Sequence, residues 1–215
     1  MKQYLLLLVT AILSVTSLAQ NNKDNAENNI PRKKAGIRIG ANFSTVNVKN
    51  TAGLKLNNRQ GLMISGFFAP ATRGIIGFRT EVVYSRQGFE LTAEDDKTVI
   101  TNDYLLFPQF TTINITRFFQ LQVGGQVGYL LNANSKTGPL RLDMKELTNR
   151  IDYGAAGGLE IYPFKGLILG GRYSMSFGNV YKQMNTAAEP GEMFSPAFDF
   201  KSRNGVISIF LGYQF

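Results

Sequence analysis

The sequence has 215 residues and a formal net charge of +8, and it contains no cysteine and no histidine. Without these residue types the chain can form no disulfide, no thiol nucleophile, no Ser–His pair and no histidine-containing metal site. The 23 lysines and arginines are scattered rather than gathered into a stripe, so the charge indicates a solvated periphery and not a nucleic-acid-binding surface.

The first predicted element is a secretory signal peptide over residues 1–19. Lys2 supplies a positive start, an apolar run follows, and Ser17-Leu18-Ala19 forms a small-x-small cleavage site. The apolar run is too short to cross a bilayer as a helix. Residues 20–34 are polar and rich in asparagine, and we interpret them as a flexible periplasmic leader. We expect one domain over residues 35–215.

After the leader, apolar and polar residues alternate with period two in one segment after another, which is the pattern of β-strands. Two segments are apolar on both faces, and we include them because they complete an even set. One of these two contains Pro108, where the missing backbone donor predicts a local bulge. The eight predicted strands are residues 35–46, 59–69, 75–88, 100–114, 118–131, 150–162, 166–177 and 204–215.

The connections between the predicted strands alternate between short and long without exception. The long connections are residues 47–58, 89–99, 132–149 and 178–203. Barrels of the Gram-negative outer membrane alternate in this way, with tight periplasmic turns and longer outer loops. The predicted fold is therefore all-β, an eight-stranded antiparallel up-and-down transmembrane β-barrel. Both termini are expected in the periplasm, because an even number of strands returns the chain to its starting side.

The neutral character of the polar faces indicates which side of the barrel meets lipid. Strand faces exposed to water would carry many lysines and glutamates, whereas these faces carry mostly Gly, Ser, Gln and Asn. Small neutral residues suit a narrow lumen, and the apolar faces then meet outer-membrane lipid. We expect the lipid to contact Phe119, Leu121 and Val123, and the lumen to hold Gln120, Gln122 and Gln126.

A secreted soluble barrel that binds a small apolar ligand, as lipocalins do, is the alternative. Its strands would also alternate, with the apolar residues inside and the polar residues outside. The tryptophan that lipocalins carry near the first strand is absent, since the chain has no tryptophan. Fractionation separates the two hypotheses, because only the soluble barrel would be recovered without detergent.

Six charged residues lie on the predicted lumen faces, three of each sign. Charges buried in a filled eight-stranded barrel must pair with one another. We interpret the set as a structural polar network that fixes the strand register, and the alternative is a proton or ion relay through the lumen. The six residues are Arg38, Arg79, Glu81, Asp152, Glu160 and Arg172.

Three further segments are weighed as binding sites. Glu94-Asp95-Asp96 could hold a hard cation, but it lacks the spacing of a calcium loop, and we expect a solvated loop and no metal. Arg32-Lys33-Lys34 is a candidate contact for anionic lipid or part of the solvated leader. The 178–203 loop either binds a partner or packs on the barrel rim, and its candidate residues are Tyr181, Met193, Phe194 and Phe198.

Several segments resemble the PorT-like outer-membrane β-barrel proteins of Bacteroidota-type bacteria. They are "AGIRIGANFST", "EVVYSRQGFE", "NDYLLFP", "VGGQVGYLL", "DYGAAGGLEI", "GGRYSMSFGNV" and the terminal "LGYQF", and the likeness spans about residues 35–215. The resemblance implies an eight-stranded barrel without a settled activity. Many relatives carry an acidic residue where this chain has Leu106, so no lumen charge is expected there.

The same resemblance bears on partners and activity. The apolar residues that alternate up to Tyr213 and Phe215 resemble the signal read by the barrel-insertion machinery. The named family member is associated with a secretion system, but the domain is used far more widely, so this role is not carried over. Proteins of the envelope or of a secretion complex stay candidate partners. Outer-membrane enzymes generally rely on histidine, so we expect no catalysis and no cofactor. The expected role is structural, anchoring or interactive.

Overall fold

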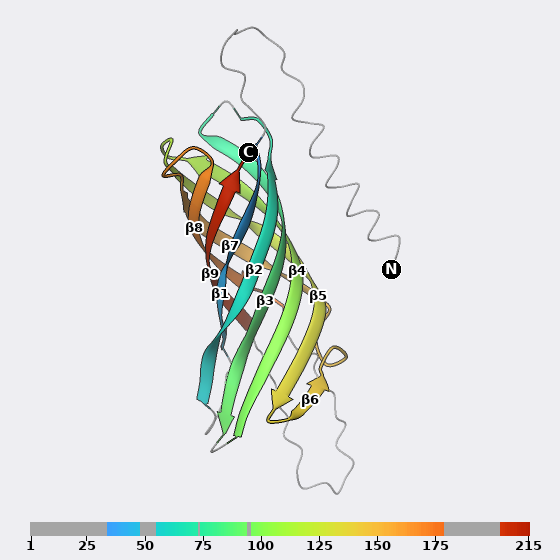
Figure 1. Cartoon of the computed structure of the whole chain (residues 1–215). Helices are drawn as coiled ribbons and strands as arrows, with labels where there is room; N and C mark the ends of the chain where they lie inside the picture. Colours follow the sequence, from blue (N-terminus) through green and yellow to red (C-terminus); the bar gives the residue numbers. More distant parts are fainter. Residues whose placement is uncertain (1–33, 48–54, 73, 94–95, 179–202) are drawn as a thin grey trace, which may run out of the picture.

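The chain forms nine β-strands in a computed structural model that describes residues 34–47, 55–72, 74–93, 96–178 and 203–215 (Figure 1). Among these residues, no helix has the length and apolar character needed to cross a membrane. The strands are β1 Lys34–Asn47, β2 Lys55–Ala69, β3 Ile76–Ala93, β4 Asp96–Asn114, β5 Phe119–Thr137, β6 Leu140–Asp143, β7 Ile151–Ile161, β8 Leu167–Ser176 and β9 Arg203–Gln214.

Eight of the nine strands close into a barrel, and the short β6 pairs only with β5. Each barrel strand is antiparallel to the next one along the chain, and β1 pairs with β9 to close the cylinder. Gly36 lies opposite Gln214, so the first and last strands begin and end at the same rim of the barrel. The predicted eight-stranded antiparallel up-and-down barrel is confirmed.

Two of the predicted long loops are largely strand. Pairing between β3 and β4 continues to Ala93 and Asp96, although residues 89–99 were predicted as a loop. β5 runs on to Thr137, and its last residues pair with β6 inside the predicted 132–149 loop. Thr98 and Thr137 lie opposite each other in these extensions and share a hydroxyl hydrogen bond of 2.8 Å across the strands. The start of β2 pairs with the extended part of β3, and these strand ends project together beyond β1, β7, β8 and β9 (Figure 1).

The bulge predicted at Pro108 is wrong. The β3–β4 ladder is interrupted there, but Thr80 pairs with Gln109 and Val83 with Leu106 in the same register on either side. The proline ring is buried in the lumen, where the missing N–H costs a ladder bond and no shift of the strand. The register shift in β4 lies instead next to Asp103, in its pairing with β5.

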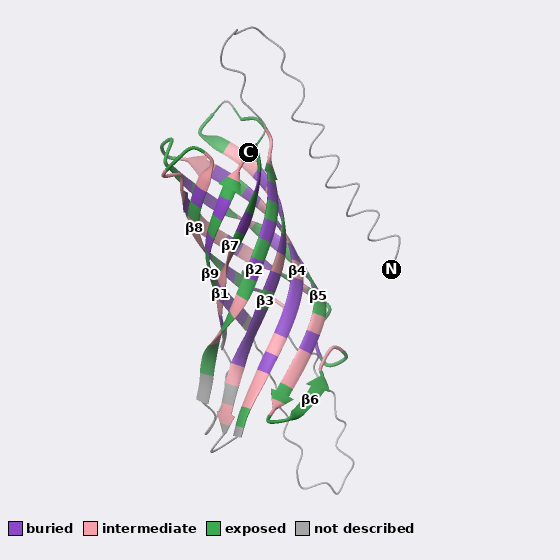
Figure 2. Cartoon of the chain, viewed as in Figure 1, coloured by how far each residue is buried: buried purple, intermediate pink, exposed green. Residues whose placement is uncertain are grey.

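Buried and exposed residues alternate along the barrel strands (Figure 2). In β5, Phe119, Leu121 and Val123 expose 47, 41 and 57% of their surface to the outside. The glutamines on the opposite face of that strand are at most 8% exposed. The predicted orientation is therefore confirmed, and the lipocalin-like alternative, which needs apolar residues inside, is not favoured.

Aromatic side chains border the apolar outer surface at both rims. Phe118 and Phe164 lie at the short-turn rim, and Tyr129 and Tyr153 lie toward the other end. The stretch of β5 from Phe119 to Tyr129 has the length of about 9–11 residues that a tilted strand needs to cross a bilayer. Membrane barrels carry such aromatic girdles at both interfaces, so this band marks the height of the lipid.

Candidate functional site

Five of the six predicted lumen charges meet in one buried cluster. Glu160 lies between Arg38, at 2.8 Å, and Arg79, at 2.7 Å. Glu81 lies between Arg172, at 2.9 Å, and Arg38, with which it also forms a hydrogen bond. Arg38 therefore joins the two carboxylates, and the side chains of all five residues are at most 4% exposed.

The cluster connects strands on opposite sides of the lumen. Arg38 comes from β1, Arg79 and Glu81 from β3, Glu160 from β7 and Arg172 from β8. In each strand the charged residue occupies an inward position of the two-residue alternation. A shift of any of these strands by one residue would turn its charge toward lipid, so the cluster can exist in one register only.

Three phenylalanine rings face the guanidinium groups, and they were not among the predicted lumen residues. Phe67 lies 4.1 Å from the Arg38 guanidinium and 4.6 Å from that of Arg79. Phe110 lies 4.3 Å from Arg172. Phe210 lies farther away, at 5.2 Å from Arg38 and 5.5 Å from Arg172. The signal for Phe67 and Phe110 was present, because their strands read as apolar on both faces.

Two glycines make room for these rings. A Cβ atom added to Gly36 would lie 2.5 Å from the Phe67 ring. A Cβ atom added to Gly170 would lie 2.4 Å from the Phe210 ring. Carbon atoms do not approach one another this closely, so a larger residue at either position would displace a ring that covers an arginine.

Polar side chains around the cluster complete its hydrogen bonding. Gln120 accepts a hydrogen bond of 2.6 Å from Arg79, and Gln122 accepts one of 3.2 Å from Arg172. The Tyr162 hydroxyl donates to Glu160 at 2.6 Å. Tyr162 follows the last residue of β7 and was missed, because only charged residues were predicted to form the lumen network.

The cluster carries three positive and two negative charges. Burying the third arginine without a carboxylate of its own would be unfavourable in a low-dielectric lumen. The faces of Phe67, Phe110 and Phe210 supply the compensation, because the negative face of an aromatic ring attracts a cation. Each of the two carboxylates thus forms ion pairs with two arginines.

Asp152, the sixth predicted residue, lies apart from the cluster. Its carboxylate accepts a hydrogen bond of 2.5 Å from Ser176, on the adjacent strand. Asp152 pairs with Gly128 in β5, closer to the long-loop end than Glu160, which pairs with Gln120. Residues eight positions apart on one strand share a face but lie too far apart for contact, which the alternation could not reveal.

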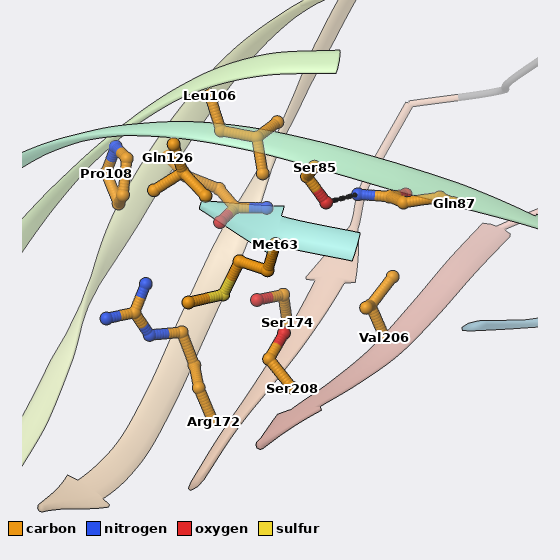
Figure 3. Close-up of a pocket in the computed structure, with 11 residues that line it drawn as sticks. Met63, Ser85, Gln87, Leu106, Pro108, Gln126, Arg172, Ser174, Val206 and Ser208 are labelled. Atoms are coloured by element: carbon orange, nitrogen blue, oxygen red, sulfur yellow. Dashed lines mark hydrogen bonds between the residues drawn. The ribbon is translucent and has the colours of Figure 1, made fainter. Parts of the chain in front are cut away.

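A second network of uncharged side chains fills the lumen beyond the cluster. The Asn42 amide donates to Ser85 at 2.8 Å, and Ser208 donates to the Asn42 carbonyl at 2.7 Å. Between the two networks lies a small cavity, lined by Leu106 and Arg172 among others, with room for about one water molecule (Figure 3). In the described part of the barrel the lumen is thus filled by side chains, and Leu106 is among them.

The other predicted residues lie elsewhere or outside the described residues. Tyr213 and Phe215 are exposed at the short-turn rim, with their rings 5.6 Å apart. Among the described residues no group of three or more acidic side chains could hold a metal ion. Some of the predicted segments and residues lie outside the described ranges. They are the signal peptide, Arg32, Lys33, Glu94, Asp95, Tyr181, Met193, Phe194 and Phe198.

Comparison with known proteins agrees with this architecture. The model of the family described as outer membrane protein beta-barrel domain matches residues 18–182. No protein with curated annotation matches. Neisserial surface protein A is similar in structure, with 11% identity and a TM-score of 0.54, covering 84% of this chain and 97% of that one.

Two further solved structures are similar at lower scores. Ail, the attachment invasion locus protein of Yersinia pestis, has 16% identity and a TM-score of 0.49, with 85% of this chain and 98% of that one covered. OprG from Pseudomonas aeruginosa has 12% identity and a TM-score of 0.40, with 86 and 97% covered. At these identities the likeness to solved structures concerns the fold alone.

Proposed function

This chain belongs to the outer membrane protein β-barrel domain family, and from that membership we propose that it acts as a non-catalytic envelope scaffold. The barrel anchors the chain in outer-membrane lipid, and its long hairpins form a surface for partners. The observation that carries this proposal is the occupied charge cluster, in which Glu81 and Glu160 are each held by two arginines. A carboxylate that is paired with two arginines is a poor general base, and it is poorly suited to accept and release protons in a relay.

The filled lumen supports a structural role over transport. An eight-stranded barrel has an interior just wide enough for its own side chains. Here the charge cluster and the Asn42 network occupy that interior, and the cavity between them holds about one water molecule. The relay hypothesis predicts free acids along the lumen, whereas Asp152, the predicted lumen acid that lies outside the cluster, accepts a hydrogen bond from Ser176.

The proposal is tested with purified protein refolded into planar bilayers and vesicles. We expect no steady conductance steps above the lipid background, and no hydrolysis of phospholipid or peptide. Large, steady conductance steps would contradict the filled-lumen role. Hydrolysis that is lost in Glu81→Gln would instead make the barrel an enzyme.

We also propose the orientation and processing of the chain. Residues 1–19 direct export, residues 20–34 lie in the periplasm, and residues 35–215 form the barrel. The short turns then face the periplasm, because outer-membrane barrels carry their longer connections outside. The absence of native cysteine allows a direct test. Cysteine in place of Glu146 should react with an impermeant maleimide in intact cells, whereas cysteine in place of Lys165 should react only after lysis.

Partners are proposed on two surfaces. Membership of the PorT-like branch would make proteins of the envelope or of a secretion complex candidate ligands of the long hairpins and of the 178–203 loop. Tyr213 and Phe215 at the end of β9 would be read by the barrel-insertion machinery. Cross-linking in intact cells followed by purification of the barrel would identify the first class. Delayed membrane assembly of a Phe215→Ser variant would support recognition by the barrel-insertion machinery.

A further inference from the structure

The short-turn rim of the barrel has a charge of one sign. The three short turns are residues 70–75, 115–118 and 162–166, and each contains one lysine or arginine and no acidic residue. Among the described residues Arg117 and Lys165 are exposed in their turns, and Lys34 is exposed at the start of β1, at the same rim. We call Lys34, Arg117 and Lys165 the basic collar.

Large apolar side chains adjoin the collar and set its height in the membrane. Phe164 precedes Lys165 and is 74% exposed, and Phe118 follows Arg117. The Arg117 guanidinium lies 4.6 Å from the Phe118 ring, so the charge is held at the edge of the apolar surface. Aromatic rings of a girdle sit at the level of the lipid headgroups, which places the collar cations at the same level.

Among the described residues, no aspartate or glutamate forms an ion pair with Lys34, Arg117 or Lys165. Glu160, the nearest acidic residue in the sequence to Lys165, is buried in the lumen and already held by Arg38 and Arg79. The opposite end of the barrel differs, because both acidic and basic residues occur there. Lys97 pairs with Glu90 at 2.8 Å at that end.

We propose that the basic collar binds the phosphate headgroups of anionic glycerophospholipids in the leaflet at the short-turn rim. Its cations come from three separate places around the circumference, the start of β1 and the β4–β5 and β7–β8 turns. A site for a soluble anion would gather cations at one point, whereas a ring of lipids meets the whole circumference. Each cation near such a surface strengthens binding by roughly fivefold.

The test measures lipid selectivity at the barrel surface. The protein is refolded into phosphatidylcholine vesicles that contain trace spin-labelled phosphatidylglycerol or phosphatidylcholine, and electron paramagnetic resonance gives the motionally restricted fraction of each. We expect several-fold selectivity for phosphatidylglycerol, reduced by 1 M salt. The double variant Arg117→Gln/Lys165→Gln should lose most of it. The matched control, Lys136→Gln/Arg141→Gln, removes two exposed cations from the other end and should keep it.

Several outcomes would overturn the proposal. They are wild-type protein without selectivity, equal selectivity in the double variant and in wild type, or loss in the control pair as large as in the collar pair. Displacement of the labelled phosphatidylglycerol by millimolar inorganic phosphate would also overturn it, because the collar would then be a phosphate site. Folding of each variant is checked by gel electrophoresis, in which a folded barrel migrates faster before heating than after heating has unfolded it.

Discussion

Arg38 in β1 and Glu160 in β7 lie 2.8 Å apart, although 122 positions separate them in the chain. Their pairing joins strands that are not neighbours in the barrel order. Because Glu160 also holds Arg79 at 2.7 Å, one carboxylate connects three strands through the lumen. The lumen cluster therefore contributes long-range contacts that the strand ladders do not supply.

Replacing Glu160 by glutamine should destabilise the barrel strongly. The change leaves Arg38 and Arg79 facing each other's charge in a buried site, and breaking a buried ion pair costs about 3–5 kcal/mol. Urea-induced unfolding in lipid vesicles measures the loss in free energy of unfolding. Asp152→Asn is the matched control, because Asp152 is an inward carboxylate bonded to Ser176 and to no described arginine. Asp152→Asn should cost about 1 kcal/mol. Equal losses in the two variants would contradict the role of Glu160 in holding Arg38 and Arg79.

Phe67→Leu should cost more than the same change at the next residue of β2. Phe67 faces the lumen and covers the Arg38 and Arg79 guanidinium groups, whereas Phe68 faces the outside. Loss of the ring removes two desolvated cation–π contacts and leaves a gap, and we expect about 2–4 kcal/mol. Phe68→Leu should cost less than about 1 kcal/mol because lipid fills the space. The same unfolding assay decides, and a larger effect at Phe68 would be inconsistent with the observed faces.

Two adjacent glycines of β8 provide a steric test. A Cβ atom on Gly170 would lie 2.4 Å from the Phe210 ring, whereas one on Gly171 would have no atom closer than 3.9 Å. Gly170→Ala should therefore destabilise the barrel by about 1–3 kcal/mol through displacement of the ring. Gly171→Ala should be neutral, since the added methyl group has space. Similar stability of the two variants would show that Phe210 is not packed as described.

A charge on the outer surface should interfere with the membrane itself. Val123→Arg places a cation in the middle of the apolar band, where arginine costs about 2–4 kcal/mol. We expect slower insertion and lower stability in vesicles. Lys136→Arg, in the part of β5 beyond the band, is the control and should insert normally. Normal insertion of Val123→Arg would argue against lipid at this height.

The sequence predicted the fold because six of the eight barrel strands alternate between apolar and polar residues. In the run from Phe119 to Tyr129, the alternation alone shows which face is apolar and which is polar, whichever strands lie beside it. The ion pairs in the lumen could not be predicted from the sequence, because the contact between Arg38 and Glu160 depends on the register of several strands. The lengths of β3, β4 and β5 were underestimated, since their ends lie outside the apolar band and carry no alternation of hydrophobicity.

The identity of the lumen aromatics shows a different limit. Phe67 and Phe110 made their strands apolar on both faces, and a lumen assumed to hold small polar residues offered no place for them. Their role depends on guanidinium groups contributed by other strands, and on glycines opposite that leave space for the rings. Composition and periodicity describe one strand at a time, whereas these contacts join three.

The central claim is that hydrocarbon surrounds the barrel, and collision accessibility of spin labels tests it most directly. Nitroxides on single cysteines introduced at Leu121, Val127 and Ile209 report the outer surface, and one at Glu146 reports a site beyond the band. In vesicles we expect the three surface labels to collide often with dissolved oxygen and rarely with a water-soluble nickel complex, and the Glu146 label to show the reverse. Frequent collisions with the nickel complex at Leu121, Val127 and Ile209 would contradict the account.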